Sequence, residues 1–226
     1  MSRSRPNVEQ SHIDIYCERI GPEFWAEPLN AISNLGFVVS ATLLILLLDR
    51  EKHARKDHAT YWGLIALVFL IGIGSGLFHT FAVRWAMWAD IIPITVFIVV
   101  YSFLALTRFV GLSRRASLSW TAAVLALTAG LPALTSFRGS TYLPAVIGMF
   151  AVGLFLRTLH QPRAVANSII ASGCIFALSL GFRTLDGPLC DTFPNGTHFL
   201  WHLLNAIVLY ILTRAFIRFT ESPIRD

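Results

Sequence analysis

Seven long runs of apolar residues dominate the chain, and polar residues gather in the segments between them. A run of about 20 apolar residues is long enough to cross a bilayer as a helix, whereas buried helices of soluble proteins are usually shorter. The pattern predicts an all-α integral membrane protein, a seven-transmembrane helix bundle with short connections. The predicted spans are Pro28–Leu48, Thr60–Thr80, Asp90–Phe109, Ala116–Leu134, Leu143–Leu159, Ala164–Phe182 and His198–Ile217.

The pattern also divides the chain into a tail and a membrane domain. Residues 1–27 are polar and become acidic near their end, and residues 28–226 hold all seven spans. Composition agrees, because only 14% of the 226 residues are charged, whereas soluble domains average about 25%. Arg3 and Arg5 are followed by polar sequence instead of the apolar stretch of a signal peptide. We therefore expect the first apolar run to act as its own insertion signal.

The basic residues predict the orientation in the membrane. With seven spans the two termini lie on opposite sides, and twelve of the 18 basic residues fall on the C-terminal side. Cytoplasmic loops are enriched in Lys and Arg, which predicts an outer N-terminus and a cytoplasmic C-terminus. The net charge of +5 comes without a basic patch of interleaved aromatics, so nucleic acid is not an expected partner. The six basic residues on the N-terminal side are Arg3, Arg5, Arg19, Arg84, Arg138 and Arg183.

Three histidines lie in apolar sequence at a similar predicted depth. His79 is near the end of the second span, and His198 and His202 begin the seventh, one helical turn apart. Even spans end, and odd spans begin, on the N-terminal side. Three neutral imidazoles with an open position are the ligand set of a catalytic zinc site. A single intramembrane histidine is often a packing residue, but the matched depth of three favours zinc and an active site towards the outer face.

Two further polar residues are predicted at this depth. Ser75 precedes His79 by four residues on the same helix face, and Asp90 opens the third span. A carboxylate beside such a site can accept a proton from the attacking water, and a hydroxyl can stabilise an oxyanion. Ser75 and Asp90 are therefore the candidate catalytic residues. Glycines at positions 72, 74 and 76 would let the second helix approach a neighbour closely.

A polar stripe begins the first span. Glu27, Asn30 and Asn34 share one helix face, and Asp14 and Glu18 lie just upstream. Such a cluster of hard oxygen ligands suits Ca²⁺. A helix cap combined with helix–helix hydrogen bonds explains the same residues equally well, so both interpretations stay open.

The chain has three cysteines. Cys174 lies in the middle of the sixth span, where a small packing residue is expected. Cys17 and Cys190 both map to the outer face, where disulfides persist. Two free thiols and one disulfide are both consistent with this placement.

Taken together, the motifs resemble a bacterial member of the alkaline ceramidase family, within a superfamily of seven-span hydrolases that includes the progestin and adiponectin receptors. This resemblance implies a place in a bacterial inner membrane. The resemblance covers nearly the whole chain. It rests on "YCER" (Tyr16–Arg19), "AEPLNAISNL" (Ala26–Leu35), "SGLFH" (Ser75–His79) followed by Asp90, and "HFLWH" (His198–His202).

The resemblance implies a seven-helix bundle with zinc near one membrane face, bound at the positions of His79, His198 and His202. It places the motif serine and aspartate at Ser75 and Asp90. Family members cleave the amide bond of ceramide, a membrane lipid, to sphingosine and a fatty acid.

The resemblance also bears on the tail. Some family members bind Ca²⁺ through the N-terminal acidic motif, which matches Glu18 and Glu27 here. The chain departs from that motif at Ile15, where the family has Asp, and at Ile20, where it has Asn; Asp14 lies one position before Ile15. The family places cysteines at positions 17 and 190, which implies a Cys17–Cys190 disulfide.

Three functions are considered for a seven-span chain with these residues. The first is a zinc-dependent amidase that hydrolyses ceramide or a related N-acyl lipid to a fatty acid and a long-chain amine. The second is a seven-span receptor or signalling protein with a structural zinc. A structural zinc has four protein ligands and no open position, whereas a catalytic zinc has three protein ligands and one open position. A transporter is disfavoured, because the sequence shows neither an inverted repeat nor a midplane charge pair.

Overall fold

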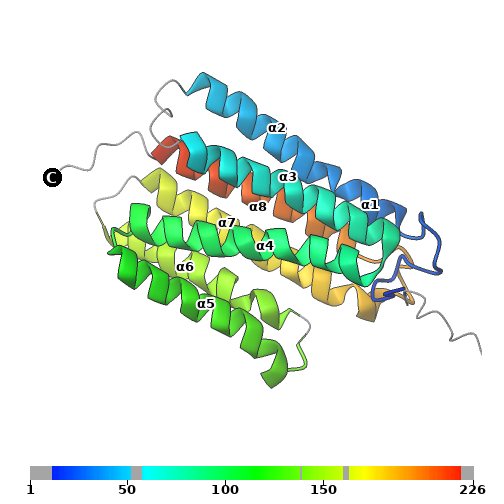
Figure 1. Ribbon diagram of the computed structural model, residues 1–226. Coiled ribbons are helices and arrows are strands. Elements are labelled where there is room, and N and C mark those ends of the chain that lie inside the picture. Colours follow the sequence, from blue (N-terminus) through cyan, green and yellow to red (C-terminus); the bar gives the residue numbers. More distant parts are fainter. Residues whose placement is uncertain (1–11, 52–57, 138, 160–162, 220–226) are drawn as a thin grey trace, which may run out of the picture.

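The computed structural model describes residues 12–51, 58–137, 139–159 and 163–219, and all regular structure in these ranges is helical (Figure 1). The basic residues Arg3, Arg5, Lys52, Arg55, Lys56, Arg138 and Arg225, which the orientation prediction counts, lie outside these ranges. The helices are α1 (Pro28–Ser33), α2 (Leu35–Arg50), α3 (His58–Phe81), α4 (Arg84–Leu104), α5 (Arg114–Leu134), α6 (Leu143–Thr158), α7 (Arg163–Leu185) and α8 (His198–Phe219). Short 3₁₀ or π segments are η1 (Ala105–Phe109), η2 (Ser140–Tyr142) and η3 (Gly187–Leu189).

The seven predicted spans are confirmed. Within the described residues, seven helical segments are long and apolar enough to cross a membrane. Helices α1 and α2 together make the first segment, and η1 prolongs α4. The main difference is the start of α4 at Arg84, so that Asp90 lies in the second turn of the helix and does not open it.

An unusually short connection joins α3 to α4. Only Ala82 and Val83 separate the two helices. Ala82 takes a left-handed conformation, with φ 48°, and its N–H donates to the carbonyl of Phe78 at 2.8 Å. A left-handed residue just after the last turn is a common helix terminator. Because the turn is so tight, the end of α3 and the start of α4 lie side by side, and they bring His79 and Asp90 to the same end of the bundle.

Helices α3 and α8 form the centre of the bundle. Half or more of their most apolar stretches is buried, 50% for α3 and 56% for α8, against 11% for the peripheral α5. Figure 1 shows the helices running alongside one another, with α3 between α2 and α4 and α8 between α2 and α7. The helices that carry the three histidines are thus the ones most enclosed by protein.

Exposed tryptophans mark both ends of the bundle. Trp25, Trp85 and Trp88 lie at the end where α3 finishes and α8 starts, which we call the histidine end, and Trp62 and Trp120 lie near the starts of α3 and α5 at the other end. Tryptophan is enriched at both membrane–water interfaces. This distribution agrees with a multi-pass membrane protein.

The segment before α1 folds over the histidine end (Figure 1). The N–H of Ile13 donates to the carbonyl of Ala82 at 2.7 Å. Cys17 forms a disulfide with Cys190, with 5.2 Å between their Cα atoms, across 173 residues of sequence. The implied disulfide is confirmed, and it fixes the tail to the loop before α8.

Candidate metal centre and active site

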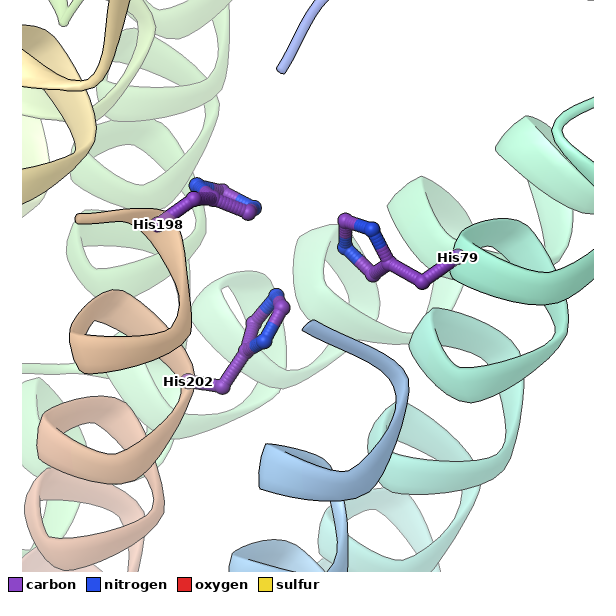
Figure 2. Close-up of side chains that lie close together, drawn as sticks. All are labelled: His79, His198 and His202. Atoms are coloured by element: carbon purple, nitrogen blue, oxygen red, sulfur yellow. The ribbon is translucent and has the colours of Figure 1, made fainter. Parts of the chain in front are cut away.

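The side chains of His79, His198 and His202 converge at the histidine end (Figure 2). One ligand atom from each lies within 4.8 Å of the others. All three residues are at most 2% exposed. Three buried imidazoles from two central helices therefore surround one small space.

Glu27 fixes the orientation of His79. The Nδ1 atom of His79 lies 2.5 Å from Oε2 of Glu27, and an ionised carboxylate only accepts hydrogen bonds. The proton is therefore on Nδ1, and a neutral ring keeps a lone pair on Nε2. That Nε2 is buried without a hydrogen-bond partner among the described residues. Arg19 holds Glu27 from the other side, through Nε and Oε1.

Ser33 sets the ring of His202 in a comparable way. The Ser33 hydroxyl donates to the carbonyl of Asn30 at 2.9 Å, which uses its single hydrogen. Its contact of 2.8 Å with Nδ1 of His202 must then be donated by the imidazole. The neutral His202 ring thus also has its lone pair on Nε2.

His198 is held by an aromatic partner and by the start of its helix. The ring of Tyr16 stacks on His198 at a centroid distance of 3.7 Å. Burial raises the pKa of Tyr16, so the phenol stays neutral. Asp186 accepts the N–H groups of Thr197 and His198 at 2.7 and 2.9 Å, and so caps α8. The Nδ1 of His198 is buried and has no partner in the described part of the chain.

These residues fit a bound metal ion. Buried ring nitrogens without a hydrogen-bond partner are uncommon in native proteins, and His79 and His198 each have one. A cation would satisfy such nitrogens, and neutral imidazoles are ligands that zinc prefers. Outer partners that fix the tautomer, such as Glu27 on His79, are the usual surroundings of metal-binding histidines. The cluster could therefore hold a metal ion.

Ser75 and Asp90 lie next to this cluster. The Ser75 hydroxyl is a hydrogen-bonding neighbour of the Asp90 carboxylate. Ser75 Oγ is 3.5 Å from Nε2 of His202. Gly74 allows this arrangement, because a Cβ there would lie 2.0 Å from the backbone oxygen of Ala89. The expected close approach of the second span is thus found, and its partner is α4.

Glu18, in the tail, has protein partners on both carboxylate oxygens. Both carboxylate oxygens of Glu18 accept backbone N–H groups at the start of α1, from Leu29 at 2.6 Å and Asn30 at 2.8 Å. Burial raises the pKa of Glu18, against the lowering effect of these two hydrogen bonds. Asp14 is exposed. The structure favours the capping interpretation of Glu18 over a Ca²⁺ ligand.

Glu27 has no free oxygen either. It binds Arg19, His79 and the amide of Asn30, which donates at 3.0 Å. Burial alone would raise the pKa of Glu27, but its hydrogen bonds with His79, Arg19 and Asn30 hold the pKa below the usual value. The Ca²⁺ site at Asp14, Glu18 and Glu27 stays a prediction, and the structure gives Glu27 a different role, as the partner of Arg19 and His79.

The structure shows three residues at the histidine end whose roles were not predicted from the sequence, Arg19, Arg183 and Asp186. From the sequence, Arg183 counts only as a basic residue on the N-terminal side, Arg19 counts as one and also ends the "YCER" motif, and Asp186 has no predicted role. Arg183 follows the predicted sixth span by one residue, but α7 continues to Leu185 and includes it. An ionisable residue inside a membrane helix is functional by default, so an extended span would have drawn attention to Arg183.

Comparison with known proteins agrees with this geometry. A family model described as Ceramidase matches residues 8–222, nearly the whole chain. The chain belongs to the ceramidase family. The resemblance seen in the sequence motifs is confirmed. Among curated proteins, no sequence matches the chain. Membership of the ceramidase family supports hydrolysis of lipid amides as the general activity.

Proposed function

We propose that this ceramidase-family chain is a zinc-dependent intramembrane amidase. It hydrolyses the amide bond of ceramide or a related N-acyl lipid to a fatty acid and a long-chain amine. The observation that carries the proposal is the buried cluster of His79, His198 and His202, with unpartnered ring nitrogens, beside the Ser75–Asp90 pair.

In this proposal, zinc is held by His79, His198 and His202. When bound, zinc supplies Lewis-acid chemistry, which polarises the amide carbonyl and makes water more acidic. Glu27 and Ser33 keep two of the imidazoles in the tautomer that can bind it.

Asp90 is the proposed proton carrier. Its carboxylate takes a proton from the attacking water and delivers it to the leaving amine nitrogen as the C–N bond breaks. Ser75, which lies between Asp90 and His202, donates a hydrogen bond to the oxygen that becomes negative in the transition state.

A receptor with a structural metal is the second candidate. Structural zinc sites have four protein ligands, and catalytic sites leave one position open. Among the described residues, three histidines make up the ligand cluster, and this number favours catalysis.

We further propose that the histidine end faces the outside of a bacterial inner membrane, with the C-terminus in the cytoplasm. Two observations support this orientation. Twelve of the 18 basic residues fall on the opposite side in the seven-span map. The Cys17–Cys190 disulfide lies at the histidine end, and disulfides persist in oxidising compartments.

The proposed function is tested with purified protein and long-chain N-acyl lipids, ceramide included. Fatty-acid release should require zinc, stop after chelation and return when zinc is added. The variant His202→Ala, which lacks a ligand, should bind no zinc and release no fatty acid. Zinc-loaded protein that cleaves none of a broad panel of N-acyl lipids would contradict the enzymatic proposal.

A further inference from the structure

Arg183 is a cation beside the metal centre for which the proposed reaction has no use. It lies on α7, two residues before the end of the helix, and is partly exposed. Its guanidinium lies 5.8 Å from the ring of Tyr16, 5.5 Å from that of Tyr142 and 5.2 Å from that of Trp201. Such aromatic surroundings hold an arginine in place without neutralising it.

Arg183 is close to the reacting groups. Its Nη1 donates to the Tyr16 hydroxyl at 2.9 Å, and the same tyrosine ring stacks on His198. One tyrosine side chain therefore separates the guanidinium from the candidate metal ligands.

Among the residues that the structure describes, no carboxylate oxygen lies within ion-pair distance of the Arg183 guanidinium. The nearest acid in sequence, Asp186, uses its two carboxylate oxygens for the N–H groups of Cys17, Thr197 and His198. A second arginine at this end, Arg19, is buried and is paired with Glu27. A guanidinium has five N–H donors, and one interaction with a neutral phenol leaves most of them for a ligand.

We propose that Arg183 binds a carboxylate on the amine side of the substrate, so that the preferred lipids are N-acyl amino acids. This inference rests on the proposed amidase function and narrows its substrate class. Arginine recognises carboxylates through two parallel hydrogen bonds, whereas the head of ceramide offers only neutral hydroxyls. In the reaction, water adds its oxygen to the acyl carbon, the C–N bond breaks and a proton joins the nitrogen, which gives a fatty acid and a free amino acid.

The test compares two lipids with the same acyl chain, N-oleoylglycine and N-oleoylethanolamine. In wild-type protein, kcat/KM should be at least about 10-fold higher for the glycine amide. The variant Arg183→Gln should lower that value about 10–100-fold, the usual effect of losing a hydrogen bond to a charged group. The ethanolamide should change no more than about threefold. The matched control is Arg84→Gln, which removes an exposed arginine at the same end and should keep the preference.

Binding gives a readout that does not need turnover. N-oleoylglycine should raise the thermal unfolding midpoint of the wild type more than N-oleoylethanolamine does, and Arg183→Gln should remove the difference. If neither lipid is hydrolysed, the amidase proposal fails for these lipids, and the midpoints alone decide whether Arg183 binds the carboxylate. If Arg183→Gln does not fold, Arg183→Lys keeps the charge but loses the paired hydrogen bonds, and should lower the preference severalfold.

Three results would overturn the inference. The first is that the wild type shows no preference between the two lipids in turnover or binding. The second is that Arg183→Gln affects both lipids equally. The third is that Arg183→Gln weakens only inhibition by oleate, in which case the anion that Arg183 binds is the carboxylate of the fatty-acid product.

Discussion

At the scale of single residues, the geometry of the histidine end depends on side chains that contact the histidines or the start of their helix. Glu27 joins Arg19 to His79, Ser33 joins the backbone of α1 to His202, and Asp186 joins Cys17 to the start of α8. None of the three is a member of the histidine cluster. Their effect is to choose the tautomer, the ring orientation or the helix start on which a metal site depends.

Glu27→Gln is expected to weaken zinc binding about 10–100-fold, the range seen when an outer partner of a metal-binding histidine is lost. Glutamine keeps the shape but not the charge that fixes the His79 tautomer. Competition with a chelator of known affinity measures the change. Glu18→Gln is the matched control, because Glu18 hydrogen-bonds to α1 and not to a histidine; its zinc affinity should stay within about threefold. Equal effects of the two variants would refute the role of Glu27.

Added Ca²⁺ is expected to leave the thermal unfolding midpoint unchanged, because Glu18 and Glu27 already have donors on their oxygens. Titration of purified protein with Ca²⁺, with Mg²⁺ as a control, measures this. A saturable rise with Ca²⁺ alone that disappears in Glu27→Gln would restore the Ca²⁺ site predicted from the sequence.

At the scale of helices, the site depends on how closely α3 and α4 approach. Gly74 lies against the backbone of Ala89, which places Ser75 beside Asp90. Sequence alone predicted both the helices and the small residues that let one helix approach another. It could not predict that Asp90 lies in the second turn of α4, because apolar periodicity does not mark a helix start within an aromatic stretch such as "WAMW".

Gly74→Ala should destabilise the protein by about 1–3 kcal/mol, the usual effect of overpacking a tight contact. It should also reduce amide hydrolysis, because α4 must move and take Asp90 with it. Thermal unfolding and turnover are measured together. Gly63→Ala on the same helix is the control, since nothing lies within 4 Å of a Cβ there. Wild-type stability and turnover in Gly74→Ala would show that the close approach has no role.

At the scale of the whole molecule, the sequence predicted the seven spans, the histidine cluster and the position of Ser75 and Asp90 at the same end of the bundle as the histidines. Charge and apolar runs are enough for this, because a membrane restricts a chain to a few arrangements. The roles of Arg183 and Asp186 could not be predicted, because each depends on a partner far away in the sequence, Tyr16 for Arg183 and Cys17 for Asp186. The choice between cap and Ca²⁺ ligand for Glu18 needed the same three-dimensional information.

The proposed orientation predicts a cytoplasmic C-terminus. Green fluorescent protein fused to the C-terminus should fluoresce in a bacterial host, and alkaline phosphatase fused there should be inactive, because it needs the oxidising periplasm to form its disulfides. The opposite pair of results would place the histidine end in the cytoplasm, where a Cys17–Cys190 disulfide would not persist.

The central claim is that the three histidines hold a catalytic metal and that Asp90 moves the proton. The most direct test measures zinc content and long-chain amide turnover on the same preparations of wild type, His198→Ala and Asp90→Asn. We predict about one zinc per chain in the wild type and in Asp90→Asn, and a 10²–10⁴-fold loss of turnover in Asp90→Asn, roughly the contribution of a general acid–base group. His198→Ala should lose both zinc and turnover. Loss of zinc in Asp90→Asn, or full zinc and full turnover in His198→Ala, would contradict the account.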